Sequence, residues 1–150
     1  AGLFAERGIA ADRLDLQGFA PHAELLDAYN TVDIALDPFP YSGGLTTCEA
    51  LWMGVPVVTL PGPTFAGRHS ASHLTNVGLT DWIVDSPDAY VEKAEAWSQD
   101  LDGLAALRAS LRERTRTSPL CDGSRFARNL ERALRRMVDA CQVADEVLLP

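Results

Sequence analysis

The segment best equipped for chemistry runs from Asp37 to Gly54 and reads DPFPYSGGLTTCEALWMG. Its paired glycines, Gly43 and Gly44, have no Cβ, so a bulky anion can approach the backbone closely. Thr46 and Thr47 follow within three residues, and their hydroxyl groups can donate hydrogen bonds to phosphate oxygens. These residue types, in this order, predict a binding site for a diphosphate.

Glu49 lies one helical turn further along, where its carboxylate can accept hydrogen bonds from the hydroxyl groups of a ribose. The same spacing has a purely structural interpretation. Thr46 and Glu49 fit the S/T-x-x-E capping box, in which the threonine caps a helix and the glutamate reaches back to the threonine backbone. The spacing alone leaves both interpretations open. A Walker loop is excluded, because no Gly-Lys-Ser/Thr follows the glycines.

Two expected strands, Val32 to Leu36 and Val55 to Leu60, flank this segment. Both are almost continuously apolar, which is typical of strands covered on both faces. The chain leaves the first strand at Asp37, which we expect to tie down the Pro/Gly-rich loop, and enters a helix near Thr46. Backbone N–H groups and the positive end of the helix dipole then point beyond the carboxyl edge of the sheet, where α/β folds bind ligands.

The wider pattern predicts βα units on a parallel sheet over residues 1–85 and helices alone over residues 87–140. A further strand is expected from Leu14 to Phe19. The expected helices are His22 to Tyr29, Thr46 to Met53, Gly67 to Val77, Ala89 to Leu101, Leu104 to Arg116 and Ser124 to Ala140. We expect residues 1–150 to form one domain. The chain opens on Ala1 inside an amphipathic run without an initiator Met, which predicts a piece of a longer protein.

Composition excludes several classes of protein. The 150 residues are 47% hydrophobic and 23% charged, as in an ordinary globular domain. The net charge of -8 argues against a nucleic-acid partner, and no apolar stretch approaches the roughly 18 to 20 residues that span a membrane. Three cysteines at unrelated spacings predict reduced thiols and a cytoplasmic location. Residues 1–100 carry 4 Lys/Arg against 14 Asp/Glu, so a phosphorylated ligand there must depend on backbone dipoles and few cations.

Other candidates carry weaker signals. Arg68 could brace the phosphate loop, pair with Asp37 or Glu49, or lie in solvent. His69 and His73 have the i,i+4 spacing of metal ligands, but no third ligand or HExxH glutamate accompanies them, so no metal is expected. Asp100 is expected to cap the helix that follows it. Seven arginines at helical spacing are expected on solvated helix faces, with contact to another lobe or an acidic partner left open; they are Arg108, Arg112, Arg116, Arg125, Arg128, Arg132 and Arg136.

A family resemblance covers nearly the whole chain. It is carried by DIALDPFPYSGGLTTCEALWMGVPVVTLPG and SPLCDGSRFARNLERALRRM, and by residues between them: Arg68, Ser70, Ser72, Leu74, Gly78 and Leu79. In register from about Phe4 to Met137, the chain resembles the C-terminal lobe of O-linked N-acetylglucosamine transferases and the related SPINDLY proteins. The resemblance implies an α/β fold with a Rossmann-like parallel sheet flanked by helices and a C-terminal helical extension. The resemblance further implies that the chain is the C-terminal, UDP-sugar-binding half of a GT-B fold.

The resemblance also implies roles for individual residues. The start of the helix would hold the diphosphate, Glu49 the ribose, and the turn from Ala20 to His22 the uracil. The full predicted nucleotide-sugar site is Ala20, His22, Gly43, Gly44, Leu45, Thr46, Thr47, Glu49 and Arg68. Leu25 and Gly44 stand where the family has histidines. The family's remaining catalytic groups lie outside this chain, so no catalytic residue is assigned within it.

The activity implied for the parent protein is metal-independent transfer of N-acetylglucosamine from UDP-GlcNAc to Ser or Thr of an acceptor protein. Within the parent protein, this chain would act together with an N-terminal lobe and tetratricopeptide repeats. The chain alone would be inactive. Two alternatives stay open. One is a SPINDLY-type protein O-fucosyltransferase that uses GDP-fucose, and the other is a non-catalytic scaffold module that binds nucleotide sugars.

Overall fold

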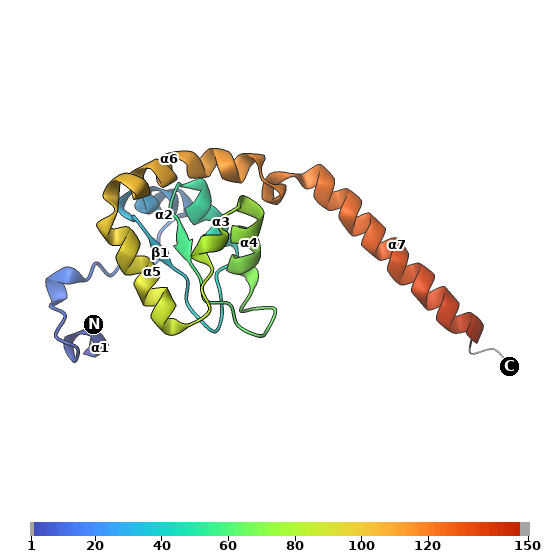
Figure 1. Ribbon diagram of the computed structural model, residues 1–150, viewed down its shortest axis with the longest axis horizontal. Coiled ribbons are helices and arrows are strands. Elements are labelled where there is room, and N and C mark those ends of the chain that lie inside the picture. Colours follow the sequence, from blue (N-terminus) through green and yellow to red (C-terminus); the bar gives the residue numbers. More distant parts are fainter. Residues whose placement is uncertain (1, 148–150) are drawn as a thin grey trace.

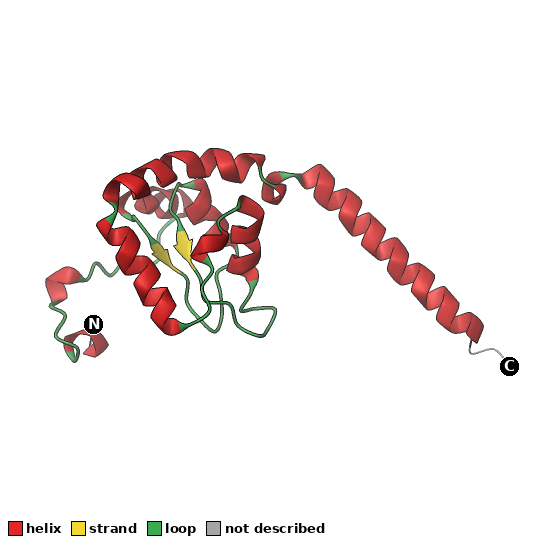
Figure 2. Cartoon of the chain, in the orientation of Figure 1, coloured by secondary structure: helices red, strands yellow, loops and turns green. Residues whose placement is uncertain are grey.

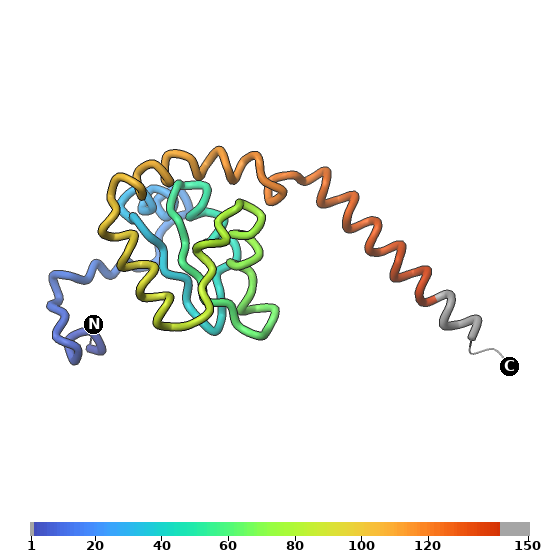
Figure 3. The backbone as a smooth tube through the Cα atoms, in the orientation of Figure 1, coloured from blue at the N-terminus to red at the C-terminus, as the bar shows by residue number. Residues whose placement is uncertain are grey.

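The computed structural model describes the backbone of residues 2–147 and the side chains of residues 2–141. Figure 1 shows an N-terminal arm, a central body of helices around a small sheet, and one long helix that extends away from the body. The tube in Figure 3 shows that the arm, the body and the long helix follow one another along the chain. The segment from Asp37 to Gly54, which carries the candidate site, lies in the body.

The sheet has two parallel strands, β1 (Ala35–Leu36) and β2 (Val57–Val58). Ala35 pairs with Val57 and Leu36 with Val58, and a further parallel bridge joins Thr59 to Ile83. Both strands lie inside the ranges expected from the sequence. Figure 2 shows them between helices, with loops leaving their carboxyl ends at one end of the body.

The strand expected from Leu14 to Phe19 is wrong. This segment is part of the extended arm, and within residues 2–147 no other segment pairs with its backbone. Leu16 is 70% exposed and Phe19 is 103% exposed, so their side chains have no core to join. A strand is stabilised by a hydrogen-bonded neighbour, which a local pattern cannot supply.

All six helices expected from the sequence are present. They are α2 (His22–Ala28), α3 (Leu45–Trp52), α4 (His69–Val77), α5 (Pro87–Gln99), α6 (Leu101–Thr117) and α7 (Gly123–Val147). α7 continues past its expected end. Short elements that the sequence did not predict are α1 (Gly2–Ala5), η1 (Ala11–Arg13), η2 (Tyr29–Thr31), η3 (Thr80–Trp82) and η4 (Pro119–Cys121).

The ends of several helices have clear local causes. A glycine follows the end of each of α3 and α4. Gly54 and Gly78 adopt φ angles of 83° and 75°, which residues with a Cβ rarely tolerate. Asp100 caps α6 as expected, because its Oδ1 accepts a hydrogen bond of 2.9 Å from the Gly103 N–H. Ser118 and Pro119 separate α6 from α7, in the gap between the expected helices Leu104 to Arg116 and Ser124 to Ala140.

One hydrophobic core holds the body together. Its fully buried side chains come from α3, β2, α4 and α6, and they include Leu51, Val58, Leu74 and Leu111, each at 0% exposure. Trp82 stacks on Trp97 at its edge, with ring centroids 5.0 Å apart. Burial of apolar side chains contributes about 1.5 to 3 kcal/mol each, so this core fixes α3 and α4 relative to the sheet.

Three arginines of α6 donate to carbonyl groups of other elements. Arg108 is partly buried, contrary to our expectation of a solvated face, whereas Arg112 is exposed as expected. Arg108 donates to the Val32 carbonyl before β1, and Arg112 donates to the Trp52 carbonyl at 2.8 Å. Arg114 donates to the Gly78 carbonyl at 2.6 Å. The last carbonyls of a helix have no partner within the helix, so they attract cations. α6 thus holds the carboxyl ends of α3 and α4.

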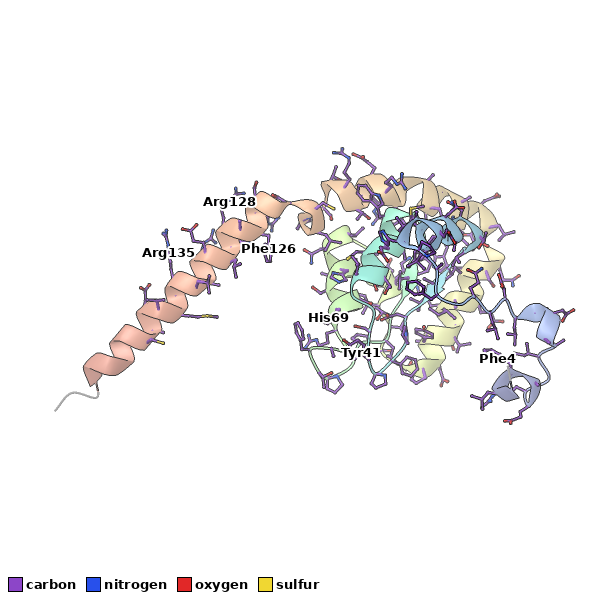
Figure 4. All side chains as sticks on the ribbon, turned by 180° about the vertical axis from the view of Figure 1, so that it is seen from behind. Phe4, Tyr41, His69, Phe126, Arg128 and Arg135 are labelled. Atoms are coloured by element: carbon purple, nitrogen blue, oxygen red, sulfur yellow. The ribbon has the colours of Figure 1, made fainter. Side chains whose placement is uncertain are left out.

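α7 behaves as the sequence predicts for a solvated helix. All its described side chains are exposed, including the four arginines expected there, and Arg116 at the end of α6 is exposed as well. Figure 4 shows Arg128 and Arg135 on one side of α7 and Phe126 on the other. In the described part of the chain, no helix combines the length and the apolar composition needed to cross a membrane.

Candidate functional site

The loop after β1 is held by the buried carboxylate of Asp37, as the sequence predicts. Its Oδ1 accepts a 2.7 Å hydrogen bond from the Gly43 N–H, and its Oδ2 accepts one of 2.6 Å from the Thr59 hydroxyl. The Tyr90 hydroxyl donates to the Asp37 carbonyl at 2.8 Å. Burial, followed by the charge of Asp37, raises the pKa of Tyr90 to about 12.

Two serines join this loop to the start of α4. The Ser42 hydroxyl accepts a 3.0 Å hydrogen bond from the His69 N–H and donates to the Ala66 carbonyl. The Ser70 hydroxyl donates to the Gly43 carbonyl at 3.0 Å and also lies 2.8 Å from the Thr47 hydroxyl. Sequence reasoning gave neither serine a role. Their contacts span more than twenty residues of chain, so no local pattern could have revealed them.

The start of α3 overturns the capping-box interpretation. Gly44 occupies the N-cap position with φ -106° and ψ -93°, and no side chain caps the helix. Thr46 is therefore the second helical residue and cannot cap it. Glycine can occupy the N-cap position here because it adopts these φ and ψ angles without steric cost.

The N–H groups of Gly44, Leu45 and Thr46 have no acceptor among residues 2–147. Leu45 is 73% exposed, and Thr46 is exposed too, so this end of α3 faces solvent. The Gly43 N–H, in contrast, is already bound to Asp37. A helix start with open N–H groups and a positive dipole end is suited to an anion.

The two threonines occupy different surroundings. Thr47 is 3% exposed, and its hydroxyl faces Ser70 inside the body. A Cβ on Gly43 would lie 2.6 Å from the Thr47 hydroxyl and 2.9 Å from the Thr46 hydroxyl, so only glycine fits there. Of the two threonines, Thr46 is the one on the exposed side of the helix start.

Glu49 lies beside His22 of α2. The Glu49 Oε1 and the His22 Nε2 are 2.7 Å apart, and the two side chains are 11% and 68% exposed. Both line a cavity of about 420 Å³, together with Leu45 and the apolar side chains of Leu26 and Trp52. The structure therefore brings together the start of α3, the expected ribose residue and the turn expected to lie against the base.

Arg68 does not join this group. It is exposed at the N-cap of α4, and none of the described residues forms an ion pair or hydrogen bond with its side chain. Pairing with Asp37 or Glu49 is thus not observed. Arg68 lines a second cavity with Phe65, His69 and other residues of α4. Within the described chain, no group of three or more His, Cys, Asp or Glu side chains gathers in a metal-binding arrangement.

The three cysteines are free thiols, as expected. Cys48 is half-buried and lines the cavity beside Glu49, with Cys121 across from it. Burial, followed by the charges of Cys121 and Glu49, raises the pKa of the Cys48 thiol. Such a thiol stays protonated near neutral pH, which favours an apolar wall over a nucleophile.

Comparison with known proteins gives consistent matches. Residues 2–130 match the family described as glycosyl transferase family 41. The chain is 42% identical over 136 residues to the probable UDP-N-acetylglucosamine–peptide N-acetylglucosaminyltransferase SPINDLY of Solanum lycopersicum, covering 90% of this chain and 15% of the relative. The corresponding protein of Hordeum vulgare is 44% identical over 133 residues, covering 88% and 14%.

The similarity extends to solved structures. A mutant of Thermobaculum terrenum O-GlcNAc transferase superposes with a TM-score of 0.85 at 45% identity, covering 93% of this chain and 27% of that one. The chain therefore spans about a seventh of the length of the curated relatives it matches, and about a quarter of that structure.

Proposed function

Because the chain belongs to glycosyl transferase family 41, we propose that it is the donor-binding lobe of an enzyme that transfers N-acetylglucosamine from UDP-GlcNAc to Ser or Thr of a protein. The observation that carries the proposal is the start of α3, where the N–H groups of Gly44, Leu45 and Thr46 lack acceptors in the described chain. The names of the relatives support the same activity.

In this proposal, the diphosphate lies against the start of α3. The three N–H groups and the helix dipole stabilise the charge that develops on UDP as the glycosidic bond breaks, which is an electrostatic role that needs no metal. Glu49 accepts hydrogen bonds from the ribose, and its carboxylate is held towards the cavity by His22. The base then lies near Ala20 and His22.

The larger protein supplies what this chain lacks. The chain would be the Rossmann-like, C-terminal half of a GT-B fold, forming a single domain over residues 1–150. The acceptor hydroxyl and its base would come from an N-terminal lobe, with tetratricopeptide repeats binding the acceptor protein. The chain alone would transfer no sugar, and a cytoplasmic location remains part of the proposal.

The identity of the base is the point on which a rival donor differs. Several relatives with 40% to 44% identity carry the name SPINDLY, and a helix start that binds UDP can bind GDP equally well, because both present a diphosphate. A SPINDLY-type O-fucosyltransferase using GDP-fucose is thus the second candidate. Titrating UDP and GDP separately distinguishes the two donors.

An NMR titration of the 15N-labelled chain with UDP tests the site. We expect the amide resonances of Gly44, Leu45, Thr46 and Glu49 to shift, with tighter binding of UDP than of GDP. Glu49→Gln should weaken both UDP and uridine about tenfold, the effect of losing a hydrogen bond to a charged group, without weakening pyrophosphate.

Glu92→Gln is the matched control, since it makes the same chemical change on an exposed residue of α5. It should leave every affinity unchanged. If UDP and GDP both leave the resonances at the start of α3 unmoved, the proposed function is wrong.

A further inference from the structure

We propose that the imidazole of His69, at the first position of α4, donates a hydrogen bond to the diphosphate bound at the start of α3. The inference rests on the proposed function, since it takes that helix start to be the phosphate site. It adds a side chain from a second helix to a site otherwise built from backbone N–H groups.

The position of the ring is the first support. If a Cβ were built on Gly44, the only described atom within 4 Å of it, apart from its chain neighbours, would be the His69 Nδ1, at 4.0 Å. Gly44 is the N-cap of α3, and its N–H has no acceptor in the described chain. The imidazole therefore borders the same helix start as this N–H group.

The ring is held in place from two sides. The His69 N–H donates to the Ser42 hydroxyl at 3.0 Å, which fixes the backbone against the loop. Phe65 packs edge-on against the imidazole, with centroids 4.5 Å apart and an interplanar angle of 85°. Figure 4 shows His69 and Tyr41 at the same loop-bearing end of the body. A donor that is already positioned loses little conformational entropy when it binds.

The charge around the site explains why a further donor would be useful. Asp37 lies beneath the loop, and a Cβ on Gly43 would lie 3.2 Å from its Oδ1, so one negative charge already borders the site. Residues 1–100 supply only 4 Lys/Arg, and Arg68, which lines the second cavity beside His69, has no atom within 4 Å of the Gly44 Cβ position. An imidazole ring can donate a hydrogen bond to phosphate in its neutral or its charged form.

His73 provides a natural control, because it lies one turn further along the same helix. Both histidines line the second cavity, with Ser72 and Asn76, but only His69 has an atom within 4 Å of the Gly44 Cβ position. Burial, followed by the charge of His69, lowers the pKa of His73, while Asp37 acts in the opposite direction.

The experiment measures the affinities of UDP, inorganic pyrophosphate and uridine for the chain and for the variants His69→Leu, His69→Asn and His73→Leu. We expect H69L to weaken UDP and pyrophosphate about tenfold and to leave uridine unchanged, because only the phosphates contact the ring. H69N should recover most of the loss, since its amide places a donor near the former Nδ1 position. H73L should match the unmodified chain.

A second measurement keeps the test independent of folding. The imidazole resonances of His69 should shift when pyrophosphate is added to the unmodified chain, and those of His73 should not. Equal UDP affinity in H69L, an equal loss for uridine, or an unmoved His69 ring would each overturn the inference. If UDP binds the unmodified chain with shifts at Gly44 to Thr46, the proposed function survives that failure; if UDP does not bind, both are wrong.

Discussion

Two arginine-rich helices, α6 and α7, follow one another in the chain and have opposite surroundings. α6 buries Leu104 and Leu111 at 3% and 0% exposure, while α7 leaves Phe126 and Met137 at 66% and 63%. In α6, arginines donate to carbonyls at the ends of other elements, whereas the described arginine side chains of α7 donate no hydrogen bond to the body. Similar patterns of side chains therefore serve different purposes.

The difference shows what an amphipathic pattern can and cannot say. Apolar residues at 3 and 4 spacing predict a helix with one face to cover, but they do not name the surface that covers it. For α6 the surface is the body, and its arginines donate to carbonyl groups at the carboxyl ends of α3 and α4 that have no partner within their own helices. For α7 every described side chain is exposed; the helix contacts η4, and its first turns share a cavity with α4.

The largest expected contrast lies in the apolar faces. Leu111→Ala should lower the free energy of unfolding by about 2 to 5 kcal/mol, because it leaves a cavity in the core. Leu134→Ala, at 53% exposure in α7, should change it by less than about 0.5 kcal/mol. Urea denaturation monitored by tryptophan fluorescence measures both. Equal destabilisation would mean that α7 packs on the body in solution.

The arginines should differ by a smaller amount. Arg114→Ala removes donors from the Val77 and Gly78 carbonyls at the end of α4 and should cost about 1 to 2 kcal/mol. Arg132→Ala, on the exposed surface of α7, is the matched control and should be close to neutral. The comparison fails if the two variants unfold at the same urea concentration.

Replacing the aspartate at the start of α6 or of α7 compares the contributions of these two helix starts. Asp100→Ala removes the cap of α6 and should cost the body about 1 kcal/mol. Asp122→Ala removes the 2.8 Å hydrogen bond to the Arg125 N–H at the start of α7. That change should lower the helix signal in circular dichroism without moving the unfolding transition of the body. A shift of that transition in Asp122→Ala would contradict the independence of α7.

The smallest effect we expect is on pH dependence, which concerns the body alone because α7 contains no tyrosine. The pKa of Tyr90 is raised to about 12, so the folded chain keeps a proton that the unfolded chain loses near pH 10. Its contribution to stability is present below pH 10 and decreases as the pH rises towards 12. Tyr90→Phe should flatten this decrease in unfolding experiments between pH 10 and 12, while the helicity of α7 stays constant.

The candidate site was predicted in part. The sequence predicted the loop, the start of α3 and the role of Asp37 in holding the loop, because glycines, a Pro-rich turn and a helix start are local features. The capping box was wrong because Gly44 takes the cap and Glu49 contacts His22, which lies 27 residues earlier. Ser42, Ser70 and His69 were given no role in the site, because their positions depend on how α4 meets the loop.

The sequence by itself determined the helices and the order of strand, loop and helix around the site. Those features follow from backbone angles and side-chain periodicity, which act over a few residues. Only the tertiary structure decided that the segment from Leu14 to Phe19 forms no strand, that α6 uses its arginines on carbonyls, and that His69 faces Gly44. Each of these depends on a contact, or the lack of one, with residues distant in sequence, and such contacts form only when the hydrophobic core folds.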